Sequence, residues 1–187
     1  MSSDGFGVKD FQLYLLKTMD PPESLLTTAL AEMGCSIDDM DASLENIQKA
    51  TWLSLGGSAE KIVTMLSEVC VSAPARSDHK VYAYNLPLWP EFDFVATFDL
   101  SGKVLSHSEF VRFAGRGPET GATPWDFTER DLVGNFDQIT RTEDWGSYTT
   151  YHARDTASDQ WYWLRFGWGL LQDIRLRKGL AAKPEAN

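Results

Sequence analysis

Three tryptophans fall within eight residues of the segment DQWYWLRFGWGLLQDIRLRK, at positions 159–178. On a predicted strand, Trp161 and Trp163 share one face with Arg165, because side chains alternate between the two faces of a sheet, and Trp168 follows in the turn GWG. Tryptophan and arginine are enriched at the energetic centres of protein–protein interfaces. We therefore predict a partner-binding face here. The competing interpretation is that the indoles pack under a loop or against arginine stems.

A second candidate contact is acidic. The segment SIDDMD reads as a loop, and its carboxylates Asp38, Asp39 and Asp41 are followed by Glu45 in the next predicted helix. The chain has a net charge of −10, and its first 75 residues hold eleven acidic and only four basic side chains. Such a charge attracts basic proteins at long range and repels nucleic acid and anionic membranes. We predict a basic protein partner, no nucleic acid and no membrane, and leave the oligomeric state open.

Residue types that serve catalysis and metal binding are present without the spacing that they need. The three histidines, His79, His107 and His152, show no metal-binding pattern, although His107 and Glu109 are expected to share a strand face. The segment GRGPETG does not match the dinucleotide fingerprint, and no nucleophile elbow, phosphate-binding loop or C-x-x-C pair occurs. We predict no catalytic residues, no metal and no cofactor. A site assembled only in three dimensions stays possible, so enzymatic activity is left uncertain, with a preference against it.

The first part of the chain has the pattern of helices, because apolar residues recur every three or four positions. Helices are predicted at 8–19, at 21–33, from about 43, and at 59–71. Asp20 is expected to cap the second helix and Gly34 to end it. The segment 51–56 fits either helix or a short strand.

The later part has the pattern of strands. A hairpin is predicted over 92–113 with Gly102 at positive φ in its turn, then a loop at 114–124 and an undecided segment at 125–143. A three-stranded meander follows at 146–154, 160–166 and 170–178. One face of the meander is predicted to be apolar and to take the helices, and it comprises Tyr162, Leu164, Phe166, Leu170, Gln172, Ile174 and Leu176. The opposite face comprises Trp161, Trp163, Arg165, Leu171, Asp173, Arg175 and Arg177.

Helices first and strands later predict an α+β fold, with N-terminal helices packed on a C-terminal antiparallel sheet. We expect one domain over 1–187, mainly helical in 1–75 and mainly β in 80–178, with a disordered tail at 179–187. Cys35 and Cys70 are expected to be buried free thiols in a reducing compartment. With no apolar leader at the start of the chain, this predicts a cytoplasmic protein.

Small size, acidity, the lack of catalytic motifs and an aromatic-rich sheet are features in which the chain resembles the immunity proteins of bacterial toxin systems. The resemblance implies an inhibitor that neutralises a basic toxin or enzyme by direct binding. The expected contacts are SIDDMD with Glu45, the loop 114–124, and the face that carries Trp161 and Trp163.

Two other functions fit the same sequence. Tryptophans beside charged groups also suit a small-molecule or carbohydrate site, or a hydrolase, in which Trp161, Trp163, His152 and Asp173 would line a pocket on the sheet. A structural or phage-type accessory subunit would instead show a large exposed apolar patch and self-association.

Overall fold

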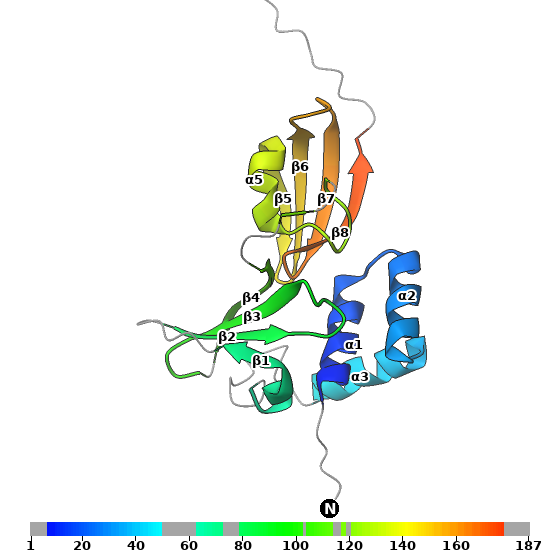
Figure 1. Ribbon diagram of the computed structural model, residues 1–187, viewed down its shortest axis with the longest axis vertical. Coiled ribbons are helices and arrows are strands. Elements are labelled where there is room, and N and C mark those ends of the chain that lie inside the picture. Colours follow the sequence, from blue (N-terminus) through cyan, green and yellow to red (C-terminus); the bar gives the residue numbers. More distant parts are fainter. Residues whose placement is uncertain are drawn as a thin grey trace, which may run out of the picture. The chain divides into compact units, whose positions relative to one another are not determined.

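The computed structural model describes residues 7–49, 63–72, 79–102, 104–113, 117–118 and 121–177. Their helices are concentrated towards the N-terminal end, and two four-stranded antiparallel sheets follow (Figure 1). The predicted α+β class is confirmed. The chain separates into two compact units, Met1–Arg116 and Gly117–Asn187. Compactness does not establish independent folding, so the single domain over 1–187 stays a prediction, and the tail 179–187 lies outside the described residues.

The helices of the first unit begin and end close to the predicted positions, with two corrections. They are α1 (Val8–Met19), α2 (Glu23–Met33) and α3 (Ile37–Lys49). Gly34 ends α2 with φ +60°, as predicted. Asp20, however, ends α1 in the left-handed region with φ +45°, and α2 begins after Pro22 without a side-chain cap, so the predicted capping role of Asp20 is wrong.

The second correction is that most of SIDDMD is helical rather than a loop, so that α3 begins at Ile37 instead of near Ser43. The Ser36 carbonyl accepts the Met40 N–H, and the Ser36 hydroxyl accepts the Asp39 N–H at 3.1 Å. The Asp39 carboxylate in turn accepts the Ser36 N–H at 2.8 Å. This reciprocal capping box starts a helix at an acidic segment, and acidic residues in the first turn are favourable to the helix dipole.

The first sheet contains strands in the order β1-β2-β3-β4. Their bounds are β1 (Cys70–Ser72), β2 (Lys80–Asn85), β3 (Phe92–Phe98) and β4 (Leu105–Arg112). The β3–β4 hairpin confirms the predicted one, and Gly102 has φ +70° in its turn. The strand β2 was not predicted. The predicted helix at 59–71 is wrong at its end, where a 3-10 turn, η1 (Ser67–Val69), leads into β1, and 51–56 lies outside the described residues.

Aromatic side chains join α1 to this sheet. The ring of Phe11 meets that of Phe94 edge to face, with centroids 5.3 Å apart, and both residues are buried. The buried Gln12 accepts the Leu88 N–H through its Oε1 atom at 2.7 Å. An N-terminal helix therefore packs on an antiparallel sheet, as the sequence predicted, and the sheet it covers is the first one.

The second unit holds the predicted meander and one further strand. Its sheet has the order β5-β6-β7-β8. The bounds are η2 (Glu129–Asp131), α5 (Leu132–Asn135), β5 (Phe136–Trp145), β6 (Tyr148–Asp155), β7 (Trp161–Gly167) and β8 (Leu170–Leu176). The strand β5, which forms one edge of this sheet, was not predicted, because it begins inside the segment 125–143 that was left undecided.

One face of this second sheet is apolar, as predicted. The pairing of β7 with β8, however, differs from the predicted one, so that a different set of β8 residues lies on this face. Leu164 and Phe166 are fully buried and pack with Phe127 and Leu132 of the segment before β5. Arg165 pairs with Asp173 and Phe166 with Leu171, so that Gln172 is the extra residue of a β-bulge. Leu171 therefore joins the apolar face. The predicted faces of Leu170 and Leu171 were wrong, because the bulge reverses the alternation: Leu171 pairs with Phe166 and Leu170 with Gly167.

No helix within the described residues is long and apolar enough to cross a membrane. Cys35 and Cys70 are free thiols, as expected. Cys70 is exposed and Cys35 partly exposed, so the predicted burial of the two thiols is wrong.

Candidate functional site: the outer face of the second sheet

The candidate site is the face of the second sheet that points away from its apolar core. Strand pairing places Trp163 beside His152 on one side and Arg175 on the other, and Trp161 beside Arg154. We call this surface the Trp–Arg face and define it by Thr150, His152, Arg154, Trp161, Trp163, Arg165, Asp173, Arg175 and Arg177. The predicted alternation along β7 is confirmed, since Leu164 and Phe166 are buried on the other side.

The indoles of Trp161 and Trp163 are both partly exposed. The guanidinium carbon of Arg175 lies 5.4 Å from the Trp163 ring centroid, in a cation–π arrangement, and Arg175 also pairs with Asp173 at 2.5 Å. Packing of an indole against an arginine, which was the competing interpretation of the sequence, is therefore observed for Trp163. It leaves part of the ring accessible.

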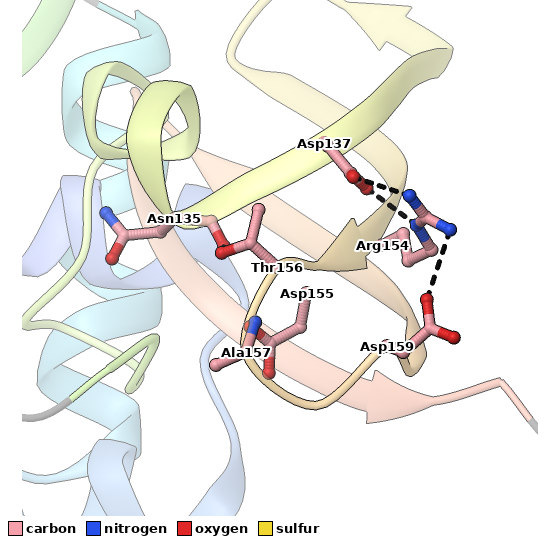
Figure 2. A network of polar contacts seen from close by, with 7 residues as sticks. All are labelled: Asn135, Asp137, Arg154, Asp155, Thr156, Ala157 and Asp159. Atoms are coloured by element: carbon pink, nitrogen blue, oxygen red, sulfur yellow. Dashed lines mark hydrogen bonds and ion pairs between the residues drawn. The ribbon is translucent and has the colours of Figure 1, made fainter.

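The guanidinium of Arg154 pairs with two carboxylates, those of Asp137 and Asp159 (Figure 2). Its Nε and Nη2 atoms donate to Asp137 at 2.8 and 2.6 Å, and its Nη1 atom lies 3.1 Å from Asp159. The hydrogen bond from Arg154 holds the pKa of the Asp137 carboxyl below its usual range, and Asp137 raises the pKa of Arg154. This arginine joins β5, β6 and the turn before β7, and its charge is already balanced.

Arg177 has a different environment. Its Nη1 atom lies 3.1 Å from His152 Nδ1. The backbone N–H of Arg177 donates to the carbonyl of Trp161 at 2.8 Å, and this bond continues the β7–β8 ladder. Burial, and then the charge of Arg177, lower the pKa of His152. The lowered pKa favours the neutral imidazole, whose Nδ1 atom can accept a hydrogen bond from the guanidinium.

The other two residues of the predicted tryptophan site occupy different positions. Arg165 lies on the face, between Thr150 and Asp173. Trp168 lies in the β7–β8 turn with φ +52°, and its backbone N–H donates to the Ser147 carbonyl at 2.7 Å, so it is at the end of the sheet rather than on the strands of the face. It is partly exposed.

Sequence reasoning missed Trp145, which is 77% exposed at the end of β5. Its signal was present in the pattern EDWGS, where an aromatic residue immediately precedes the turn glycine Gly146.

The acidic candidates lie in the first unit and share α3. Asp38 and Glu45 are exposed, and Asp41 pairs with Lys17 of α1 at 2.7 Å. Asp39 belongs to the capping box, whose hydrogen bonds from Ser36 lower the pKa of its carboxyl. Asp39 and Asp41 thus have structural partners, and Asp38 extends the charge of the helix surface. These acids and the tryptophans are described within separate units, so whether they serve one interface stays a prediction.

Ser36→Ala should lower the free energy of unfolding by about 1 kcal/mol, because it removes the side-chain acceptor of an N-cap. Urea denaturation at pH 7 measures this, with Asp38→Ala as a control in the same helical turn but outside the capping box. The contribution of Asp39 should be present at neutral pH and be lost as the pH falls through its lowered pKa, because protonation removes the acceptor for the Ser36 N–H. An unchanged midpoint for Ser36→Ala would contradict the capping role.

A groove of about 430 Å³ lies elsewhere in the second unit. It is lined by Gly121, Ala122, Gly134, Asn135, Phe136, Asp155, Thr156, Ala157, Tyr162 and Ile174. The turn Asp155–Ala157 and Asn135 form part of its wall (Figure 2). The Asp155 carboxylate accepts the Ala157 N–H at 3.0 Å, which fixes that turn. None of the four residues expected to line a pocket (Trp161, Trp163, His152 and Asp173) lines this groove.

Other titratable residues of the described chain do not form a metal site. His107 and Glu109 do share a face of β4, with Nε2 and Oε1 3.6 Å apart. Burial raises the pKa of Asp93, on the paired strand β3. No group of three or more histidine, cysteine or acidic side chains within the described ranges could hold a metal ion.

Comparisons with protein-family models, with curated proteins and with solved structures found no match.

Proposed function

We propose that this protein is a non-enzymatic, cytoplasmic binding protein of the inhibitor or immunity kind, which neutralises a basic toxin or enzyme by direct contact. The observation that carries the proposal is the Trp–Arg face, where the partly exposed Trp161 and Trp163 lie on neighbouring positions of one strand face. Partly exposed indoles lose their remaining contact with water when a protein covers them, and each then adds apolar area to the interface.

The acidic surface supplies the second part of the proposal. The exposed Asp38 and Glu45 of α3, together with the net charge of −10, favour fast encounter with a basic protein. Charge steering sets the association rate, whereas a desolvated aromatic anchor sets the lifetime of the complex. The two surfaces would then have separate kinetic roles.

Trp163→Ala should weaken partner binding by about 30-fold or more, which is the usual effect of truncating a tryptophan at an interface centre. The full chain is immobilised, partners are captured from a lysate of the native host at low and high salt, and the purified partner is then titrated by calorimetry. Leu176→Ala is the control, because it truncates an exposed apolar residue that pairs with Tyr162 on the opposite face of the same sheet.

Binding by Trp163→Ala at the wild-type affinity would refute the role of this face. If Trp163→Ala also loses its cooperative melting transition, Trp161→Ala replaces it. Loss of the transition in both variants would make these residues core components and would refute the proposal in the same way.

The alternative of a small-molecule or carbohydrate site is favoured by one observation, the groove of about 430 Å³ with Phe136 and Tyr162 in its wall. This volume lies within the range of ligand pockets, and aromatic walls are common in them. Glycan arrays and a thermal-shift screen test this alternative. A ligand whose effect is abolished by Tyr162→Ala and retained in Trp163→Ala would favour the groove over the Trp–Arg face.

A further inference from the structure

The charges of the Trp–Arg face differ from those of the chain as a whole. Four arginines lie on it (Arg154, Arg165, Arg175 and Arg177), although the chain is acidic. Arg154 is balanced by two aspartates, and Arg175 by Asp173. Of the two exposed arginines on the face, Arg175 pairs with a carboxylate, whereas Arg177 lies beside His152.

Arg177 is exposed, and the side chain beside it is the imidazole of His152 rather than a carboxylate. Within the described residues no ion pair is formed by Arg177. An apolar or basic surface that covered it would remove water from a cation without replacing those interactions, which is unfavourable. A carboxylate would instead accept charge-assisted hydrogen bonds from the guanidinium.

The surroundings of Arg177 also suit a carboxylate on a side chain. Trp161 lies beside Arg177 across the β7–β8 ladder, and Trp163 lies beside Arg175. The methylene groups of a glutamate or aspartate can pack on an indole while its oxygens meet a guanidinium. A nucleic acid also carries oxygen anions, but a long polyanion is repelled by a chain of net charge −10, whereas a protein can place one or two carboxylates locally. Short probes of similar charge are repelled to a similar extent, so their comparison reports the local contact.

We propose that the protein segment bound by the Trp–Arg face is acidic, and that a carboxylate of this segment pairs with Arg177 while its apolar atoms cover Trp161 and Trp163. This rests on the proposed protein-binding function and specifies the chemistry of the contact. A partner of net basic charge is compatible with it, because net charge governs the approach and local groups govern the contact.

The first test uses hexaglutamate as the probe, with hexaglutamine and a six-nucleotide oligothymidine for comparison. The isotopically labelled full chain is titrated and followed by NMR at the indole N–H signals of Trp161 and Trp163 and the Nε–H signal of Arg177. We expect saturable shifts of these signals with hexaglutamate, and an affinity about tenfold lower in Arg177→Gln, as for the loss of one charge-assisted hydrogen bond. Arg141→Gln is the matched control, because Arg141 is an exposed arginine that contacts Tyr151 on the opposite side of the same sheet.

Three results would overturn the inference. They are no shift at these signals, equal shifts with hexaglutamine, or tighter binding of the oligothymidine at the same residues. The captured partner then separates this inference from the proposed function. A partner sensitive to Trp163→Ala but not to Arg177→Gln refutes only the acidic contact, whereas a partner sensitive to neither refutes the binding face itself.

Discussion

Phe166→Ala should lower the free energy of unfolding by about 3–5 kcal/mol, the usual cost of removing a phenylalanine from a packed core. Phe166 is fully buried, and its ring meets that of Tyr151 edge to face with centroids 5.7 Å apart. Leu164 and Leu171 pack in the same cluster, so the truncation leaves a cavity that strand pairing prevents from closing. Urea denaturation followed by circular dichroism measures the change.

The control for Phe166→Ala is Val133→Ala, since Val133 is 81% exposed on α5 of the same unit. Its effect should stay within about 0.5 kcal/mol, as for most surface substitutions. A loss below about 1 kcal/mol in Phe166→Ala would mean that this cluster is not a packed core, because the transfer term alone exceeds that value.

Phe110→Ala should have a similar cost, about 3–5 kcal/mol, in the first unit. Phe110 is fully buried, and its ring centroid lies 4.9 Å from Trp89 and 5.3 Å from Phe94. Phe94 in turn contacts Phe11 of α1, so the truncation weakens the contact between the sheet and its helix as well as the sheet itself. Denaturation in urea gives the change, and Leu100→Ala is the control because Leu100 is 61% exposed in the β3–β4 turn.

Comparing the two core variants also tests the single domain predicted for 1–187. If the chain unfolds as one cooperative domain, Phe110→Ala and Phe166→Ala each shift one common transition. If the units unfold separately, each variant shifts only the transition of its own unit. Hydrogen exchange read at amides of β3 and of β7 distinguishes these outcomes.

Several elements follow from the sequence because their causes are local. The spacing of Phe11, Leu15 and Met19 predicted α1, and all three are buried. Gly34 ended α2 as expected, because a glycine adopts positive φ without steric cost. Strict alternation predicted β3, since every second residue of Phe92–Phe98 is buried.

Other elements were missed because a local signal was read incompletely. The capping box of Ser36 and Asp39 is a local pattern, yet the run of aspartates was read as a loop. The strands β2 and β5 carry weaker alternation, and they are stabilised by pairing with β3 and β6, the strands that follow them in the chain. Strand propensity depends on such neighbours more than helix propensity does.

By itself the sequence determined the α+β class, the end of α2 at Gly34 and the meander. It also determined that Trp161, Trp163 and Arg165 share one face. These features follow from periodicity and turn chemistry, which act over a few residues. Only the tertiary structure decided the bulge at Gln172, which places Leu171 in the core, and the pairing of charges on the face. Arg154 is neutralised by Asp137 and Asp159, whereas Arg177 lies beside the imidazole of His152. That difference determines which charge a partner must balance, and it depends on which strands lie side by side.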